Sequence, residues 1–132
     1  MENMKILIVD DDVDLTKAIR ATLESNQYTV VTAADRATGM ERVKSERPDL
    51  LILDVMMGTW HDGFEMSREI KSDPQLKDIP ILMLTSIEDK TGIEFKSTAG
   101  DPKWLPVDGF LDKPVEPDVL LAEVKKLLPS KA

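Results

Sequence analysis

The segment LLILDVMM, Leu50 to Met57, decides the fold because it is an apolar run interrupted by a single aspartate, Asp54. A short apolar run of this kind is typical of a β-strand that is covered on both faces, as the strands of parallel sheets are. An ionised carboxylate is almost never buried unless a nearby group compensates its charge. The aspartate in this strand therefore indicates a site where other charged groups come together.

Four further apolar segments accompany this one, and the five segments begin 22 to 29 residues apart. That spacing leaves room for one helix between each pair of strands. Alternating strands and helices predict an α/β fold, a doubly wound parallel sheet of five strands flanked by helices on both faces. The five predicted strands are MKILIV (4–9), YTVVTA (28–33), LLILDV (50–55), IPILMLT (79–85) and VDGFLDK (107–113).

The segments between the strands carry the periodicity of helices that bury one face. The first helix follows Asp12, which we expect to be its N-cap, and the last begins at Pro117 and Asp118, residues suited to a first helical turn. The other helices are predicted at about 36–46, before Pro48, at about 63–72, and within 88–100. The predicted buried positions include Leu15, Ala18, Ile19, Thr22, Leu23, Ala37, Met40, Val43, Met66, Ile70, Leu120, Val124, Leu127 and Leu128.

Composition bounds the classes of function. At 132 residues the chain is expected to form one domain, and without cysteine it has no disulfides, thiolate metal sites or cysteine nucleophile. No apolar stretch reaches the roughly 18–20 residues of a membrane span, and the N-terminal residues lack the apolar core of a signal peptide, so a cytoplasmic protein is expected. The net charge is −8 and the basic residues are scattered, which argues against direct binding of nucleic acid.

Polar side chains follow four of the predicted strands. In an open parallel sheet the carboxyl ends of the strands form the ligand site, so we expect these side chains to share one crevice. Three carboxylates there require a cation, and Mg²⁺ with its preference for oxygen ligands suits them. A carboxylate nucleophile beside a metal, a hydroxyl and an ammonium predicts phosphoryl transfer. The three carboxylates are those of Asp10, Asp11 and Asp54, because Asp12 of the same DDD run is the expected N-cap; the other polar residues are Thr85 with Ser86, and Lys113.

Five motifs occur in the order and near the spacing of a known family. They are KILIVDDD, PDLLILDVMM, DGFEMSREIKSD, IPILMLTS and FLDKPV. With them the chain resembles, over essentially its whole length, the CheY-like receiver domains of response regulators in two-component signalling. The resemblance implies a flavodoxin-like sheet with strand order 2-1-3-4-5. It also implies a single receiver domain over residues 1–132.

The resemblance also implies a role for each motif residue. Asp54 is the phospho-acceptor, and Mg²⁺, which Mn²⁺ can replace, is held by Asp10, Asp11 and Asp54 with the backbone carbonyl of Met56. Thr85 is the hydroxyl that reorients toward the phosphoryl group, and Phe110 is the switch aromatic. Lys113 pairs with the phosphoryl oxygens and is followed by Pro114 through a cis peptide. The implied partners are a histidine kinase or phosphotransfer protein and a downstream protein target, with no nucleic acid and no membrane. Such a domain is a signalling module that catalyses only its own phosphorylation and dephosphorylation.

The chain departs from the family chiefly between Thr85 and Lys113, which stand 28 residues apart. An extended loop at about 97–107 is therefore predicted. Two alternative functions remain at this stage. A phosphohydrolase of the haloacid-dehalogenase type uses a similar set of groups, with an Asp-x-Asp motif that Asp10 to Asp12 match superficially, but it leaves Asp54 without a role. The second alternative is an unphosphorylated scaffold that has the receiver fold.

Overall fold

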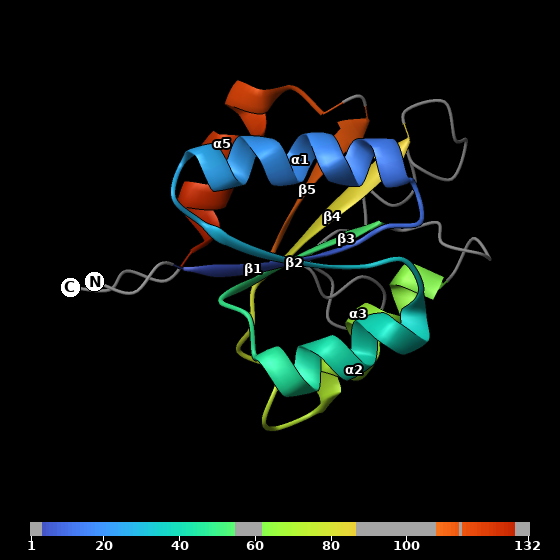
Figure 1. Ribbon diagram of the computed structural model, residues 1–132. Coiled ribbons are helices and arrows are strands. Elements are labelled where there is room, and N and C mark those ends of the chain that lie inside the picture. The colour runs from blue at the N-terminus through green and yellow to red at the C-terminus, as the bar shows by residue number, and fades with distance from the viewer. Residues whose placement is uncertain (1–3, 55–61, 87–107, 114, 129–132) are drawn as a thin grey trace.

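The computed structural model describes residues 4–54, 62–86, 108–113 and 115–128 of the chain (Figure 1). Strands and helices alternate along this part of the chain. The elements are β1 (Lys5–Val9), α1 (Val13–Ser25), β2 (Thr29–Ala33), α2 (Arg36–Glu46), β3 (Leu50–Asp54), α3 (Asp62–Ser72), β4 (Ile81–Ser86), β5 (Gly109–Lys113) and α5 (Pro117–Leu127).

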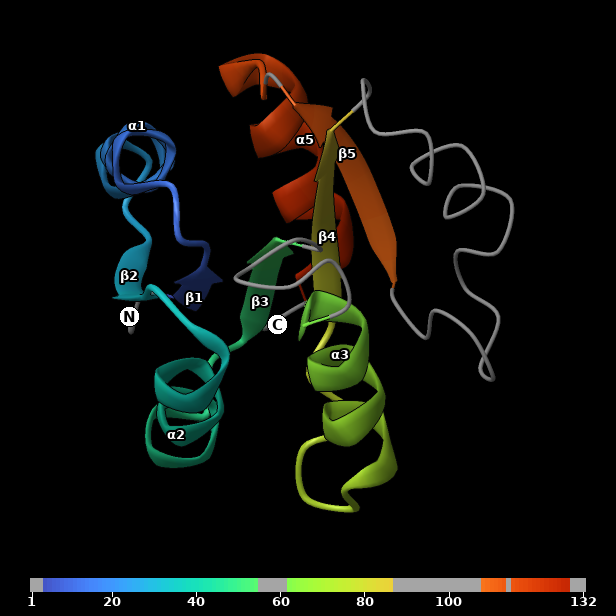
Figure 2. The ribbon, with the colours of Figure 1, turned by 90° about the vertical axis from the view of Figure 1, so that its right-hand side faces the viewer.

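The strands form one parallel sheet in the order β2-β1-β3-β4-β5. Helices α1 and α5 cover one face of this sheet, and α2 and α3 cover the other (Figures 1 and 2). The strand order reverses direction at β1, whose neighbours are β2 and β3. The predicted doubly wound α/β fold with five parallel strands is therefore confirmed, and the carboxyl ends of β1 and β3 lie side by side at the switch point where such folds bind ligands.

Burial on both faces explains why the strands read as continuous apolar runs. Successive side chains of a strand point to opposite faces, and here both faces are covered by helices. On β1, Leu7 and Val9 pack with α2 and α3, whereas Ile6 and Ile8 pack with α1 and α5. The same alternation continues on β3, β4 and the buried faces of the helices, and it divides the core into two clusters separated by the sheet.

The helix boundaries follow local chemistry. The side chain of Asp12 caps α1 by accepting a hydrogen bond from the Leu15 N–H at 3.0 Å, as predicted. Asp35 caps α2 in the same way, through the Thr38 N–H at 2.7 Å. Helix α5 begins with Pro117 at its first position, where the missing N–H costs nothing.

Two predicted buried positions are wrong. Ala18 of α1 and Ala37 of α2 are exposed, because the buried face of each helix is narrower than the sequence pattern predicted. The buried residues of α1 are Ile19 and Leu23, and those of α2 are Gly39, Met40 and Val43. The helix predicted within 88–100 and the loop at 97–107 lie outside the described residues. In the described part of the chain, no helix has the length and apolar character needed to cross a bilayer.

Candidate functional site

Three carboxylates meet where β1 and β3 end. The two strands are paired in parallel with Val9 opposite Leu53, so Asp10 and Asp54 follow at neighbouring positions of the same edge. Asp10, Asp11 and Asp54 each place one carboxylate oxygen within 4.8 Å of the other two. Asp10 and Asp54 are 2% and 4% exposed, and Asp11 is exposed to solvent. Two buried acids and one open acid thus form a cluster with a side that a ligand can approach.

The backbone around Asp10 holds this cluster in place. The Asp10 N–H donates to the Ala33 carbonyl at 3.1 Å, which continues the pairing of β1 with β2 beyond the last strand residue. Asp10 Oδ1 accepts a hydrogen bond from the Asp12 N–H at 2.9 Å, which turns the chain into α1. The Asp12 side chain is directed instead to the first turn of that helix, where it caps Leu15. Of the three consecutive aspartates, two therefore serve the cluster and the third serves the helix.

The cluster has the ligand chemistry of a magnesium site. Carboxylate oxygens are hard ligands, and Mg²⁺ binds through one or two of them while keeping water and phosphate oxygens in its other positions. Three like charges this close repel one another, and a divalent cation relieves that repulsion. Asp10, Asp11 and Asp54 would hold the cation, which would supply charge neutralisation for phosphate oxygens. The open side at Asp11 leaves room for such oxygens.

The register of the sheet locates the other predicted site residues. On β4, Leu84 is opposite Asp54, so Thr85 stands one position further toward the carboxyl edge. On β5, Lys113 is opposite Ser86 and is the last residue of the strand. The backbone thus brings Thr85 and Lys113 to the edge that carries Asp54, while Phe110 is opposite Met83, deeper in the sheet. Met56 and Pro114, and with them the predicted metal carbonyl and cis peptide, lie outside the described residues.

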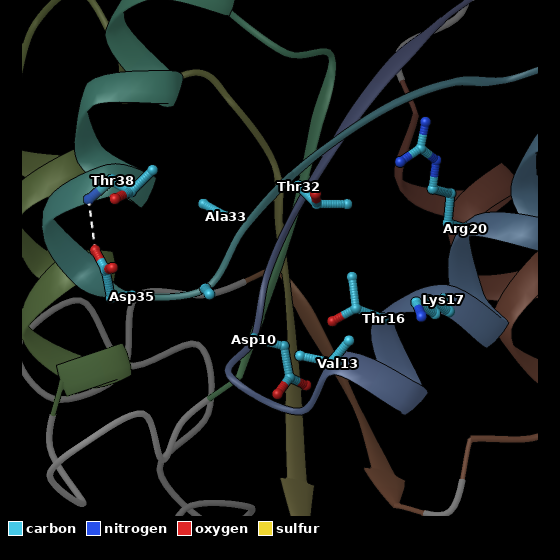
Figure 3. A pocket seen from close by; sticks show the side chains of 10 residues that line it. Asp10, Val13, Thr16, Lys17, Arg20, Thr32, Ala33, Asp35 and Thr38 are labelled. Carbon is cyan, nitrogen blue, oxygen red and sulfur yellow. Dashed lines mark hydrogen bonds between the residues drawn. The ribbon is translucent and has the colours of Figure 1, made fainter.

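A hollow of about 420 Å³ lies beside the carboxylate cluster, and sequence patterns did not predict it (Figure 3). The first two turns of α1 line one side of it, the N-terminus of α2 lines the other, and Thr32, Ala33 and Ala34 at the end of β2 form its floor. Asp10 belongs to both the cluster and the wall of the hollow. We call it the α1–α2 hollow. The short side chains of Ala33 and Ala34 are the one sequence feature that fits a hollow here, and they do not predict it, because the hollow depends on how two helices approach one strand.

Comparison with known proteins decides the family. Residues 6–125 match the family described as the response regulator receiver domain. The chain belongs to this family. The receiver domain is 37% identical over 126 residues to response regulator MprA of Mycobacterium ulcerans (strain Agy99), covering 96% of this chain and 50% of the relative. It is 34% identical over 126 residues to the alkaline phosphatase synthesis transcriptional regulatory protein PhoP of Bacillus subtilis (strain 168), covering 96% and 49%.

Solved structures agree with the assignment. The chemotaxis response regulator CheY4 of Vibrio cholerae superposes with a TM-score of 0.79 at 31% identity, covering 96% of this chain and 99% of that chain. The signal receiver domain of a signal transduction histidine kinase from Syntrophus aciditrophicus gives a TM-score of 0.81 at 30% identity, covering 95% and 89%. The predicted family and its phospho-accepting role in two-component signalling are thereby confirmed. The receiver domain spans about half the length of the curated relatives it matches.

Proposed function

We propose that this receiver domain accepts a phosphoryl group on Asp54, with Mg²⁺ held by Asp10, Asp11 and Asp54. The observation that carries the proposal is the approach of these three carboxylates to within 4.8 Å at the switch point of the sheet. Asp54 is the natural acceptor because it ends the central strand and is almost fully buried, whereas Asp11 is open to solvent. Burial keeps water away from the acyl phosphate that would form.

The donor is proposed to be a phosphohistidine of a histidine kinase or of a phosphotransfer protein. A carboxylate oxygen of Asp54 attacks the phosphorus, the phosphorus–nitrogen bond breaks, and the imidazole leaves. Negative charge on the three equatorial oxygens requires neutralisation, which a Mg²⁺ ion held by Asp10, Asp11 and Asp54 would supply. Lys113 is proposed to pair with another oxygen, and the support is that β5 ends at this residue on the same edge of the sheet as Asp54. The Met56 carbonyl is the proposed backbone ligand.

The output is proposed to be a change in protein contacts rather than catalysis on a separate substrate. Thr85 is the proposed hydroxyl that moves toward the phosphoryl group, with Phe110 as the coupled aromatic on the adjacent strand. The downstream target is proposed to be a protein. A haloacid-dehalogenase-type phosphohydrolase is not favoured, because it would leave the buried Asp54 at the centre of the cluster without a role. The scaffold alternative predicts no covalent phosphate at all.

The test is the intact mass of the protein after incubation with acetyl phosphate and Mg²⁺. We expect one added phosphate on the wild type, none without Mg²⁺, and none on Asp54→Asn. Asp12→Asn is the matched control, because it removes a neighbouring carboxylate that caps α1, and asparagine caps equally well. If Asp54→Asn gained a phosphate on the same residue that peptide analysis finds phosphorylated in the wild type, Asp54 would not be the acceptor. No adduct and no Mg²⁺-dependent beryllofluoride binding in the wild type would favour the scaffold.

A further inference from the structure

An aspartate stands immediately before each of two strands and ties the start of that strand to its neighbour. Asp49 precedes β3: its N–H donates to the Lys5 carbonyl at 2.7 Å, and its carboxylate oxygen Oδ2 accepts the Lys5 N–H at 2.8 Å. Asp108 precedes β5 and forms the same two bonds with Ile81 of β4, at 2.9 Å and 2.8 Å. We call the pairs Asp49–Lys5 and Asp108–Ile81 the amino-edge clamps, because they lie at the edge of the sheet where the parallel strands begin.

Each amino-edge clamp stands one position before the first backbone pair of its ladder. That first pair is Ile6 with Leu50 between β1 and β3, and Leu82 with Gly109 between β4 and β5. The aspartate oxygen accepts the N–H with which the neighbouring strand begins, and leaving such a group without an acceptor would cost free energy. Main chain and side chain of the same aspartate bind the same partner residue, so the two bonds together define which residues stand opposite each other.

The clamp before β5 is held by a third residue, Lys71 near the end of α3. Lys71 Nζ donates to Asp108 Oδ2 at 3.0 Å, and also to the carbonyls of Lys77 at 3.1 Å and Ile79 at 2.8 Å in the turn that leads to β4. The lysine side chain is only 20% exposed, so its charge-assisted bonds are partly withdrawn from water. A long segment, residues 87–107, joins β4 to Asp108, and this contact fixes where the segment enters the sheet.

Both clamped strands are five residues long and end at a residue of the proposed phosphoryl site, β3 at Asp54 and β5 at Lys113. A strand rises about 3.3 Å per residue, so a slip of one position would move the last residue by that distance and turn its side chain to the other face. We propose that Asp49 and Asp108 are positioning residues for phosphorylation, because they set the registers that bring Asp54 and Lys113 to one edge. This inference rests on the proposed function, in which Lys113 pairs with the phosphoryl group.

The test measures two affinities of the full chain: for Mg²⁺ alone, and for the phosphoryl analogue beryllofluoride at saturating Mg²⁺. Asp108→Ala should weaken beryllofluoride about tenfold and leave the Kd for Mg²⁺ unchanged, because Lys113 is proposed to contact the phosphoryl group and not the metal. Asp49→Ala should weaken both ligands, since Asp54 serves both, but only about threefold, because β3 is a central strand paired on both sides and β5 is an edge strand. Ile19→Val, a buried substitution in α1 away from both clamps, is the control for lowered stability and should change neither Kd.

Two further variants separate positioning from a general loss of structure. Asp108→Asn should keep most of the beryllofluoride affinity, because an amide oxygen in the place of Oδ2 can still accept from the Ile81 N–H and from Lys71 Nζ. Its intact mass is checked, since asparagine before a glycine can deamidate to aspartate. In a Lys113→Met background, Asp108→Ala should weaken beryllofluoride no further, because both changes act through one contact.

The outcomes distinguish this inference from the proposed function. A wild-type Kd for beryllofluoride in Asp108→Ala, an equal loss of Mg²⁺ affinity in that variant, or a loss of the same size without Lys113 would overturn the role of Asp108. Unchanged affinities in Asp49→Ala would overturn the role of Asp49. If the wild type itself showed no Mg²⁺-dependent binding of beryllofluoride, the proposed function would fail and this inference would fail with it.

Discussion

Replacing one carboxylate of the cluster should stabilise the metal-free protein. In Asp10→Asn one of three like charges disappears, while the amide oxygen can still accept the hydrogen bond that Asp12 N–H donates at 2.9 Å. Two unit charges separated by the 4.8 Å limit of the cluster repel by about 3.5 kcal/mol at an effective dielectric constant of about 20, and by about 1 kcal/mol in bulk water. Asp10→Asn relieves two such pairs, one with Asp11 and one with Asp54, so the limits become about 2 and 7 kcal/mol. Since Asp10 is 2% exposed but Asp11 is open to solvent, the gain lies in the lower half of this range, at about 2 to 4 kcal/mol.

The assay is urea-induced unfolding followed by circular dichroism, once in EDTA and once at saturating Mg²⁺. Wild type should gain stability from Mg²⁺, because a ligand that binds only the folded state adds free energy in proportion to the logarithm of its concentration over its Kd. Asp10→Asn should start higher in EDTA and gain much less from Mg²⁺. Asp12→Asn is the control: it lies beside the cluster, keeps its cap, and should behave as wild type in both conditions.

Two results would refute this reasoning. If Asp10→Asn were less stable than wild type in EDTA, repulsion among the three carboxylates would not be a significant cost of the folded state. If the variant gained as much stability from Mg²⁺ as wild type does, Asp10 would not contribute to the cation site. A parallel loss of stability in Asp12→Asn would instead trace the effect to the start of α1.

Three further outcomes are expected. Gly39→Ala should lower the free energy of unfolding by about 1 kcal/mol, because a Cβ there would lie 2.9 Å from Cγ1 of Val9. Overpacking costs about 1–3 kcal/mol, which exceeds the gain of about 1 kcal/mol in helix propensity. Urea unfolding of the variant and the wild type shows whether the net change is a loss. Lys71→Met should cost about 1 to 3 kcal/mol in the same assay, since Lys71 Nζ donates to two carbonyls and to Asp108 at 3.0 Å. The pKa of Asp35 is lowered in the folded state, so its ionised carboxylate stabilises the fold above pH 3.8, and this stabilisation is lost as the pH falls through the folded pKa. The difference in free energy of unfolding between wild type and Asp35→Ala should therefore shrink below that pH in acid unfolding curves.

The sequence predicted the fold well because its strongest signals are local. A strand buried on both faces must be apolar throughout, and β1 and β3 are so whatever their neighbours are. The caps at Asp12 and the proline at the start of α5 act within a single turn, so they too can be recognised from adjacent residues. Strand order cannot be recognised in this way, because no property of one strand identifies the strand that pairs with it. It followed from the resemblance of the motifs to a family.

The site also has a part that could be predicted from the sequence and a part that could not. Asp10, Asp11 and Asp54 were predicted together because the carboxyl ends of parallel strands share one edge, a rule of topology rather than of side-chain geometry. The α1–α2 hollow follows no such rule. Thr16 and Asp35 are ordinary residues for a helix face and an N-cap, and only the approach of two helices across Ala33 and its neighbours makes them face one space.

Stability and function make opposite demands on the edge where β1 and β3 end. The apolar run of β3 stabilises the sheet because both faces are covered, and the same cover withdraws Asp54 from water until it is 4% exposed. A buried carboxylate beside Asp10 and Asp11 raises the free energy of the empty folded state, and any cation or phosphoryl group that neutralises the cluster lowers it. The charge in the middle of LLILDVMM is therefore a reason for the domain to respond to ligands. A domain with asparagine at Asp10 would be more stable and, for that reason, less responsive.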